Sequence, residues 1–202
     1  MIRLDQEDGL WIATIDRPDK ANSLTAAMLE DLCQIAEDAL TGARGLVLTG
    51  AGKVFSAGAD LEAAKAGLAV SPLWERLSGA IARHPGLTIC AMNGTVAGGA
   101  MGMALACDLR ISVAGAKVFY PVMKLGFLPQ PSDPARLAAL VGPARAKMIL
   151  MAGQKIPVDE ALIWGLVDRI VSGDLLDEAR ALASDTLGAE ADHARAIKKL
   201  IG

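Results

Sequence analysis

The chain has 202 residues, of which 52% are hydrophobic and 3% aromatic, and its formal net charge at pH 7 is −3. A chain of this length can bury one sizeable core, built here mainly from aliphatic side chains. The acidic balance provides no basic field for nucleic acid or for an anionic membrane surface.

The sequence also argues against a membrane span, a secreted protein and a metal site. No run of about eighteen apolar residues is present, and acidic residues interrupt the N-terminus at once, so we expect a cytoplasmic protein without a signal peptide. The three cysteines, Cys33, Cys90 and Cys107, lie in apolar segments and are expected to be free thiols. The sequence has no Cys-x-x-Cys or His-x-x-x-His spacing, so we expect no bound metal.

The first fifty residues predict a hairpin, a helix and a buried strand. Ile2–Gln6 and Trp11–Ile15 alternate as strands do, and Asp8-Gly9 between them is a strong hairpin signal. Apolar residues in Leu24–Leu40 recur at helical spacing, and Leu46–Thr49 reads as a buried strand.

The middle of the chain repeats a pattern of strand, glycine turn and helix. Residues 60–70 predict a short helix or loop, and Pro72–Arg83 predicts a helix after Ser71. Leu87–Met92 is expected to be a strand, followed by a helix over Ala100–Cys107 and a strand over Leu109–Val113.

The last third predicts helices punctuated by glycine and proline. No low-complexity linker divides the chain, so we expect a single α/β domain over residues 1–202, with residues 134–202 as a helical C-terminal region. The expected helices are Pro134–Leu140, Pro143–Met151, Val158–Trp164 and Leu175–Leu187.

Two glycine turns carry the functional signal. Ala57-Gly58-Ala59 and Gly98-Gly99 each occur after an apolar run, where the chain turns towards a helix. If the two turns lie side by side, they offer two backbone N–H groups to one oxygen atom. That arrangement is an oxyanion hole, which stabilises negative charge as it develops on a carbonyl group.

These turns are part of an ordered series of motifs that resembles the crotonase, or enoyl-CoA hydratase/isomerase, superfamily. The resemblance covers nearly the whole chain. Its motifs are Ala13-Thr14-Ile15-Asp16-Arg17-Pro18, Lys20-Ala21-Asn22-Ser23-Leu24, Leu46-Val47-Leu48-Thr49-Gly50, Phe55-Ser56-Ala57-Gly58-Ala59-Asp60-Leu61, Asn93-Gly94-Thr95-Val96-Ala97-Gly98-Gly99-Ala100 and Gly165-Leu166-Val167-Asp168.

The resemblance implies a ββα spiral core over residues 1–133 and a CoA thioester as substrate. The thioester oxygen would sit between the N–H groups of Ala59 and Gly99. The chain ends at a pattern that the family shows before its last helices, so those helices are expected to be missing. A homotrimer or hexamer is implied, with the helices at 143–151 and 158–164 covered by a neighbour and Trp164 as an anchor.

The CoA moiety of the substrate is the sole cofactor that the resemblance implies. Lys20, Ala21 and Ser23 match the family's loop that approaches the phosphates and pantetheine. The matching segment along the adenine and thioester arm contains Ala57, Asp60 and Leu61.

The chain departs from the family at its acid and base positions. Where hydratases of this family carry two glutamates, the chain has Gly102 and Val122. Hydration needs groups that activate water and deliver a proton, so isomerase or decarboxylase/lyase chemistry is favoured. Gln130 occupies a third functional position, where it can orient a carboxylate or hydroxyl, or merely satisfy backbone groups. Tyr120 and Lys124 flank this segment and are weaker candidates.

Two other functional classes remain open. A catalytically degenerate acyl-CoA-binding protein would also explain the missing glutamates. A dinucleotide-binding turn at Gly94–Gly99 is disfavoured, because the spacing is not Gly-x-Gly-x-x-Gly. His84 is better explained as a residue that complements a helix end, and Glu62 and Lys65 as a solvated helix face.

Overall fold

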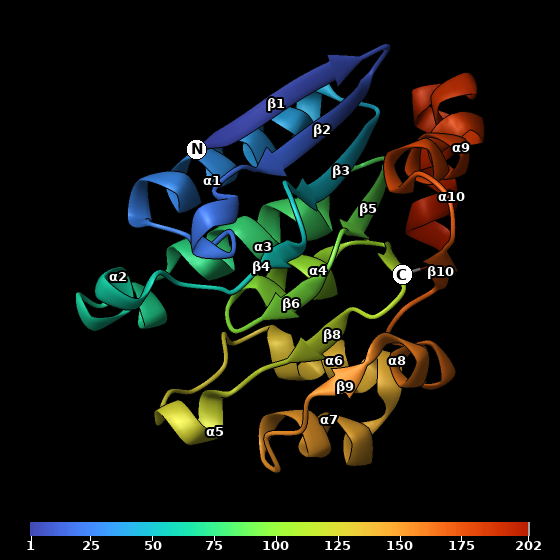
Figure 1. The fold of residues 1–202 in the computed structure, drawn as a ribbon. Helices are drawn as coiled ribbons and strands as arrows, with labels where there is room; N and C mark the ends of the chain where they lie inside the picture. Colours follow the sequence, from blue (N-terminus) through green and yellow to red (C-terminus); the bar gives the residue numbers. More distant parts are fainter. Residues whose placement is uncertain (202) are drawn as a thin grey trace.

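The computed structural model describes residues 1–201 as two sheets surrounded by helices (Figure 1). In the larger, six-stranded sheet the strand order is β1-β2-β3-β5-β7-β10. The β1–β2 pair is antiparallel, as the Asp8-Gly9 hairpin signal predicts, and the other neighbours are parallel. The strands are β1 (Ile2–Glu7), β2 (Leu10–Ile15), β3 (Gly45–Gly50), β5 (Leu87–Met92), β7 (Leu109–Val113) and β10 (Arg169–Val171).

The smaller, four-stranded sheet has the order β4-β6-β8-β9. Along the chain β3 is followed by β4, β5 by β6, and β7 by β8, so each turn of the chain adds one strand to each sheet. This alternation confirms the predicted spiral core. The strands are β4 (Val54–Ser56), β6 (Thr95–Ala97), β8 (Lys117–Phe119) and β9 (Ile156–Pro157), of which β8 and β9 are antiparallel.

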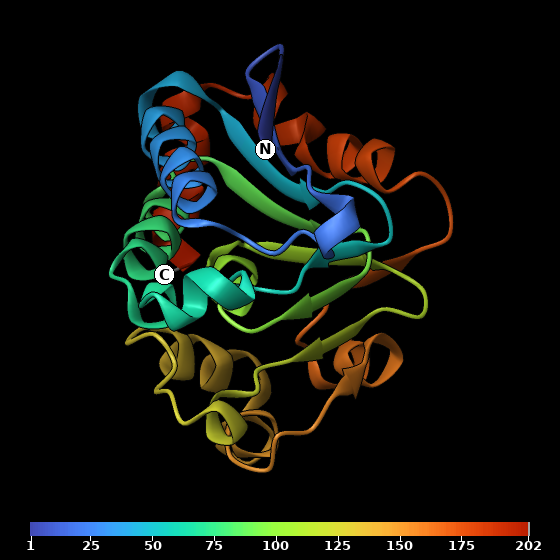
Figure 2. The same cartoon turned by 60° about the vertical axis from the view of Figure 1, so that its left-hand side comes forward.

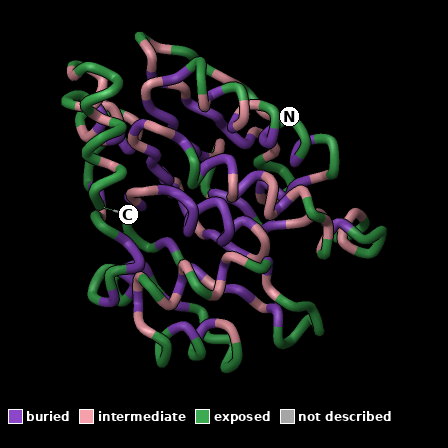
Figure 3. Tube along the Cα trace, turned by 180° about the vertical axis from the view of Figure 1, so that it is seen from behind, coloured by how far each residue is buried: buried purple, intermediate pink, exposed green. Residues whose placement is uncertain are grey.

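Helices cover both faces of the larger sheet (Figures 1 and 2). Successive residues of β3 point to opposite faces: Leu46 and Leu48 pack with α1, α3 and α4, whereas Val47 packs with α9. The buried part of the chain lies in the centre of the molecule (Figure 3). The helices are α1 (Ala26–Gly42), α2 (Leu61–Lys65), α3 (Leu73–Arg83), α4 (Ala100–Ala106), α5 (Val122–Leu125), α6 (Asp133–Val141), α7 (Pro143–Leu150), α8 (Val158–Trp164), α9 (Leu175–Gly188) and α10 (Ala191–Ile201), with 3₁₀ turns at Pro18–Lys20 and Leu68–Val70.

The first helix starts later than the periodicity predicts. The apolar spacing predicts a helical conformation at Leu24, but α1 begins at Ala26. Its N-cap is Thr25, whose side chain accepts a hydrogen bond from the Met28 N–H. Leu24 instead forms a parallel β-bridge with Ala59. A tertiary contact with the first glycine turn therefore replaces the helical conformation that the apolar spacing predicts at Leu24.

Trp164 is not the anchor of a subunit interface that the sequence predicts, because its own chain buries it. Trp164 is 8% exposed within its own chain, and the Arg145 guanidinium lies 5.4 Å from the ring centroid. Little of the ring is left for a neighbouring subunit. The exposed apolar side chains around α7 and α8 are Met148, Met151, Leu162 and Ile163.

Three further observations concern the described residues 1–201. No helix is long and apolar enough to cross a membrane. Cys33, Cys90 and Cys107 are buried free thiols, as predicted. No group of three His, Cys, Asp or Glu side chains is placed to hold a metal ion.

Candidate active site

The two glycine turns pack directly against each other. They follow β4 and β6, which are parallel neighbours, so both turns lie at the same edge of the smaller sheet. A Cβ atom on Gly58 would lie 2.9 Å from the Ala97 carbonyl oxygen and 3.1 Å from the Gly99 nitrogen. Gly58 also has a φ of +86°, which other residues rarely adopt. Only glycine at 58 therefore allows this close approach.

The first turn is held by hydrogen bonds on both sides of Ala59. The Leu24 N–H donates to the Gly58 carbonyl, and the Asp60 N–H donates to the Leu24 carbonyl, both at 2.8 Å. Ser56 Oγ accepts from the Gly58 N–H at 3.1 Å. Within residues 1–201, the Ala59 N–H itself has no acceptor. The turn is fixed while one donor stays available.

The second turn is fixed in a similar way. The Gly98 N–H donates to the Phe119 carbonyl at 3.2 Å, and a Cβ atom on Gly99 would lie 3.0 Å from the ring of Trp74. Trp74 is buried, and its Nε1 donates to the Leu68 carbonyl at 2.8 Å. The Gly99 N–H likewise finds no acceptor in the described chain. It lies at the start of α4, where the helix dipole favours negative charge.

Both turns line one cavity of about 280 Å³. In Figure 1, α2 and α5, whose residues contribute to its walls, lie on the same side of the molecule. The lining is mostly apolar, with Lys65 and Tyr120 as polar members, so it suits an acyl chain attached to a polar head. The lining residues are Ala57, Ala59, Leu61, Ala64, Lys65, Ala69, Trp74, Gly98, Gly99, Tyr120, Pro121, Val122, Leu125, Phe127 and Leu128.

The residues predicted to bind CoA fall into two groups. Ala57 and Leu61 line the cavity together with Ala59 and Gly99. Lys20, Ala21 and Ser23 lie outside the lining but adjoin the first turn: the Ala57 N–H donates to the Ala21 carbonyl at 3.0 Å, and Lys20 is exposed.

Asp60 ties the first turn to the loop that follows β2. Its Oδ2 accepts from Arg17 at 2.8 Å, and its Oδ1 accepts from the N–H groups of Glu62 and Ala63 at the start of α2. The hydrogen bond from Arg17 lowers the pKa of the Asp60 carboxyl group, with help from these backbone donors. In this conformation the carboxylate caps a helix and pairs with Arg17.

Gln130 lies beside the cavity and does not line it. Its side chain is buried, and Nε2 donates to the carbonyl of Ala69 at 3.4 Å. Its backbone N–H lies 3.4 Å from the Tyr120 hydroxyl oxygen, to which it donates. A role in orienting substrate stays a prediction, because the amide now satisfies a backbone group.

Asp133 is a buried carboxyl group that the sequence analysis missed. It begins α6, is fully buried, and accepts a hydrogen bond from the Tyr120 hydroxyl through Oδ2 at 3.0 Å. Its Oδ1 has no partner in the part of the chain that the structure describes. Burial raises the pKa of this carboxyl group to about 6, although the Tyr120 hydrogen bond and nearby Arg136 oppose that shift. No local motif marks such a residue.

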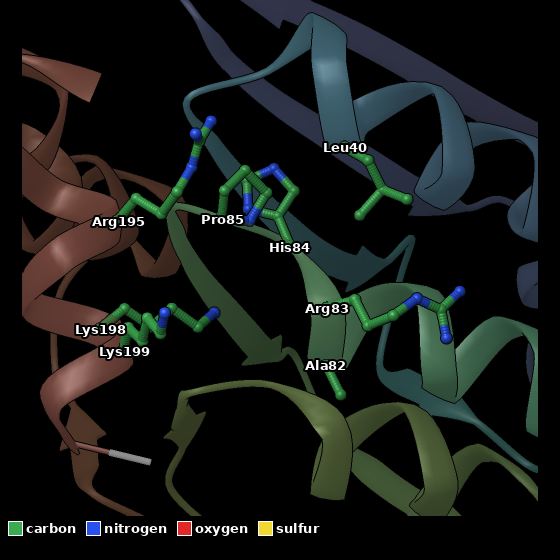
Figure 4. Close-up of a pocket in the computed structure, with 8 residues that line it drawn as sticks. All are labelled: Leu40, Ala82, Arg83, His84, Pro85, Arg195, Lys198 and Lys199. Atoms are coloured by element: carbon green, nitrogen blue, oxygen red, sulfur yellow. The ribbon is translucent and has the colours of Figure 1, made fainter. Parts of the chain in front are cut away.

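A second cavity, of about 530 Å³, lies between the end of α3 and α10 (Figure 4). Arg83, Arg195, Lys198 and Lys199 make its lining basic, and none of the lining residues within 1–201 has a carboxylate side chain. His84 is buried there, and burial lowers the pKa of its imidazole. Its Nδ1 accepts from the Gly86 N–H at 3.1 Å, so the ring supports the turn after α3. The cavity between the glycine turns is the better candidate.

Comparisons with known proteins found a matching family model and similar sequences. The family model for enoyl-CoA hydratase/isomerase matches residues 5–201. The carnitinyl-CoA dehydratase of Salmonella enteritidis is 37% identical over 202 residues, an alignment that covers 93% of this chain and 74% of that protein.

Solved structures superpose closely on nearly the whole chain. The crystal structure of an enoyl-CoA hydratase from Bacillus anthracis has a TM-score of 0.90 and 30% sequence identity, and the match covers 99% of this chain and 81% of that one. DspI from Pseudomonas aeruginosa has the same TM-score and 31% identity, with 99% and 79% covered.

Proposed function

The chain belongs to the enoyl-CoA hydratase/isomerase family, and from that premise we propose that it holds an acyl-CoA thioester with the carbonyl oxygen between the N–H groups of Ala59 and Gly99. The observation that carries this proposal is the contact between the two glycine turns, which leaves both N–H groups without an acceptor in residues 1–201. An incoming oxygen would satisfy two half-buried donors at once.

The chemistry at this position is stabilisation of an enolate. When a bond at the α-carbon breaks and its electron pair moves towards the carbonyl, negative charge develops on the thioester oxygen. Two backbone donors that are already oriented stabilise that charge without reorganisation, and one such donor is typically worth about 10²–10³ in rate. Double-bond migration and decarboxylation both pass through such an enolate.

Hydration is the less favoured reaction, because neither Gly102 nor Val122 can move a proton. Val122 lines the cavity with an apolar side chain, and Gly102 is buried in α4. A group that activates water is therefore missing from both family positions. We infer an isomerase or a decarboxylase/lyase of the enoyl-CoA hydratase/isomerase family.

The CoA arm would lie along the first turn, with Ala57 and Leu61 beside the thioester end. Exposed Lys20 is available to the phosphates, and the CoA moiety of the substrate is the one cofactor proposed. Ala21, Ser23 and Asp60 hold the first turn in place. The Ala21 carbonyl accepts a hydrogen bond from the Ala57 N–H, and the side chains of Ser23 and Asp60 both accept from Arg17.

The second candidate is an acyl-CoA-binding protein without turnover, which the residues at 102 and 122 also favour. Incubation of the purified protein with malonyl-, methylmalonyl-, 3-enoyl- and 2-enoyl-CoA, followed by mass spectrometry, separates the two. Conversion of the 3-enoyl or malonyl-type esters supports the enzyme. Binding of all four esters without a product supports the binding protein, and efficient hydration of the 2-enoyl ester contradicts the proposed chemistry.

A further inference from the structure

The carboxyl group of Asp133 lies where a side chain at position 102 would lie. A Cβ atom on Gly102 would be 3.0 Å from Asp133 Oδ1 and 3.1 Å from Oδ2. Glycine at 102 therefore gives a carboxyl group from another helix access to this region of the core, between α4 and α6. Gly102 has no side chain, and Asp133 of α6 places a carboxyl group in this space instead.

Tyr120 connects this buried carboxyl group to the cavity. Tyr120 lines the cavity, whereas Asp133 does not, and the Tyr120 hydroxyl lies 3.0 Å from Asp133 Oδ2. A tyrosine hydroxyl has one hydrogen and two lone pairs. The hydrogen goes to Asp133 and one lone pair accepts from the Gln130 N–H, so a second lone pair remains for a group in the cavity.

We propose that Tyr120 is the catalytic residue that takes and returns the substrate proton, and that Asp133 acts through it as the positioning residue and proton partner. This inference rests on the proposed function, because it needs an acyl-CoA whose α-carbon lies in the cavity. It assigns to this pair the proton transfer that Gly102 and Val122 cannot perform.

The transfer balances in both directions. As the α C–H bond breaks, its proton bonds to the Tyr120 oxygen, and the Tyr120 hydrogen moves to Asp133 Oδ2. The C–H electron pair becomes the enolate held by the two N–H groups. In a 3-enoyl ester the return step runs backwards to the γ-carbon: Tyr120 gives up its proton there and regains one from Asp133. The double bond migrates, and no net proton is consumed.

The surroundings of Asp133 allow it to hold a proton near neutral pH. The ionisable groups that face it are Tyr120, Arg136 on its own helix, and Glu75 of α3, whose carboxylate accepts from the Ser132 hydroxyl and N–H. Arg136 Nη1 donates to Ser78 Oγ at 2.9 Å, which holds the guanidinium in place. Burial and Glu75 raise the pKa of the Asp133 carboxyl group, and burial raises that of the Tyr120 phenol well above its ordinary value. The phenolate is therefore avoided, because Asp133 takes its proton in the same step.

The test compares the unmodified protein with Tyr120→Phe, Asp133→Asn and the double variant. Exchange of the α-hydrogens of butyryl-CoA in D₂O, followed by NMR from pH 5 to 8, reports proton removal whatever the final product is. Butyryl-CoA binding is measured in parallel by calorimetry. Asparagine keeps the shape of Asp133 and its contact with Tyr120 but cannot hold the transferred proton.

Each single variant should lose about 10²-fold or more in exchange rate while it binds butyryl-CoA as before. The double variant should lose no more than either single one, because the two residues act as a unit. In the unmodified protein the exchange rate should rise with pH through about 6, as Asp133 ionises and can accept a proton, and Asp133→Asn should abolish that rise.

Three outcomes would overturn the pairing: exchange that survives Tyr120→Phe, a pH profile that Asp133→Asn leaves unchanged, or an unmodified protein that binds butyryl-CoA without exchanging its α-hydrogens. In each of these cases acyl-CoA binding stands. Failure of the proposed thioester site has a different signature, because the unmodified protein would then bind no acyl-CoA at all.

Discussion

The α-carbon of Gly58 faces the amide nitrogen of Gly99, so closely that a Cβ atom on Gly58 would lie 3.1 Å from that nitrogen. Two turns that are about forty residues apart in sequence are thereby held backbone to backbone. The distance between the two free N–H groups, and with it the shape of the oxyanion hole, depends on this contact.

Substitution of Gly58 by alanine tests the contact. The added methyl group would push against the Ala97 carbonyl and Gly99, so acyl-CoA turnover should fall by about tenfold or more, since small misplacements of reacting groups are costly. The backbone strain itself should lower the free energy of unfolding by about 1–2 kcal/mol. Steady-state kinetics and urea denaturation measure the two effects.

Gly115→Ala is the matched control for Gly58→Ala. Gly115 also has a positive φ, of +77°, but a Cβ atom there meets nothing within 4 Å. The Gly115→Ala variant should therefore lose free energy of unfolding as Gly58→Ala does, but its turnover of acyl-CoA should equal that of the unmodified protein. Equal loss of turnover in both variants would mean that the contact between the turns is not what matters.

Removal of the Gly99 N–H tests the second donor. Gly99 has a φ of −59°, which proline adopts without strain, so Gly99→Pro removes the hydrogen while it keeps that dihedral angle. Turnover should fall by about 10²–10³ beyond the loss in Gly99→Ala, which adds atoms against Trp74 but keeps the N–H. If the two folded variants turn over substrate equally fast, the Gly99 N–H is not an oxyanion donor.

How far the sequence predicts this site depends on whether a residue acts through local or tertiary geometry. The turns at Gly58 and Gly98 are local glycine features, so the sequence predicts two possible donor turns. Their place at the ends of β4 and β6, two three-residue strands of the smaller sheet, is a tertiary feature that the sequence does not predict. Asp133 could not be found in this way. Its significance comes from the space beside Gly102, which is created by the packing of α6 on α4.

Asn22 is a second residue whose environment depends on tertiary packing and not on the local sequence. Asn22 lies in the motif before the first helix, and nothing in the residues around it predicts a buried side chain. In the structure it is fully buried, with Nδ2 donating to the carbonyls of Ala51 and Val54 and Oδ1 accepting from the Arg17 N–H. The two Nδ2 partners, Ala51 and Val54, lie after β3, so no pattern within the loop itself reveals them.

The raised pKa of Asp133 predicts a pH dependence of stability. The folded protein keeps the proton up to about pH 6, whereas the unfolded chain releases it near pH 3.8, so between these values the folded state binds more protons. The contribution of Asp133 to stability is complete below the lower value and is lost as the pH rises through the upper one. From pH 5 to 7.5 the free energy of unfolding should lose roughly 1.4 kcal/mol through this group.

Asp133→Asn lacks this ionisation and isolates the effect. Urea denaturation at pH 5 and 7.5 should show that the stability of the variant relative to the unmodified protein increases between the two pH values. Parallel pH dependence in both proteins would show that Asp133 does not titrate in this range.

The exposed apolar side chains around α7 and α8 predict assembly. Met148, Met151, Leu162 and Ile163 would be left in water in an isolated subunit, and we propose that a neighbour covers them in a homotrimer or hexamer. Light scattering should report a mass that is a multiple of three subunits, and Ile163→Glu should reduce it. Val70→Glu, at an exposed apolar residue outside these helices, should leave the mass unchanged. A stable monomer at micromolar concentration would refute the proposal.

The residues at 102 and 122 predict that crotonyl-CoA is hydrated at least about 10²-fold more slowly than a 3-enoyl-CoA is isomerised, because two proton-transferring groups are needed for hydration. Absorbance of the conjugated 2-enoyl thioester follows both reactions: it rises when a 3-enoyl-CoA is isomerised and falls when crotonyl-CoA is hydrated. A hydration rate equal to the isomerisation rate would show that some other residue activates water.

The position of the thioester oxygen is tested most directly by the infrared spectrum of the carbonyl group in bound butyryl-CoA, labelled with ¹³C at that carbon. If the oxygen lies between the Ala59 and Gly99 N–H groups, two donors polarise the C=O bond, and its stretching frequency should be lower in the complex than in free butyryl-CoA. In the Gly99→Pro complex part of this shift should disappear. A bound thioester whose carbonyl frequency is the same as in free solution would contradict this placement of the oxygen atom.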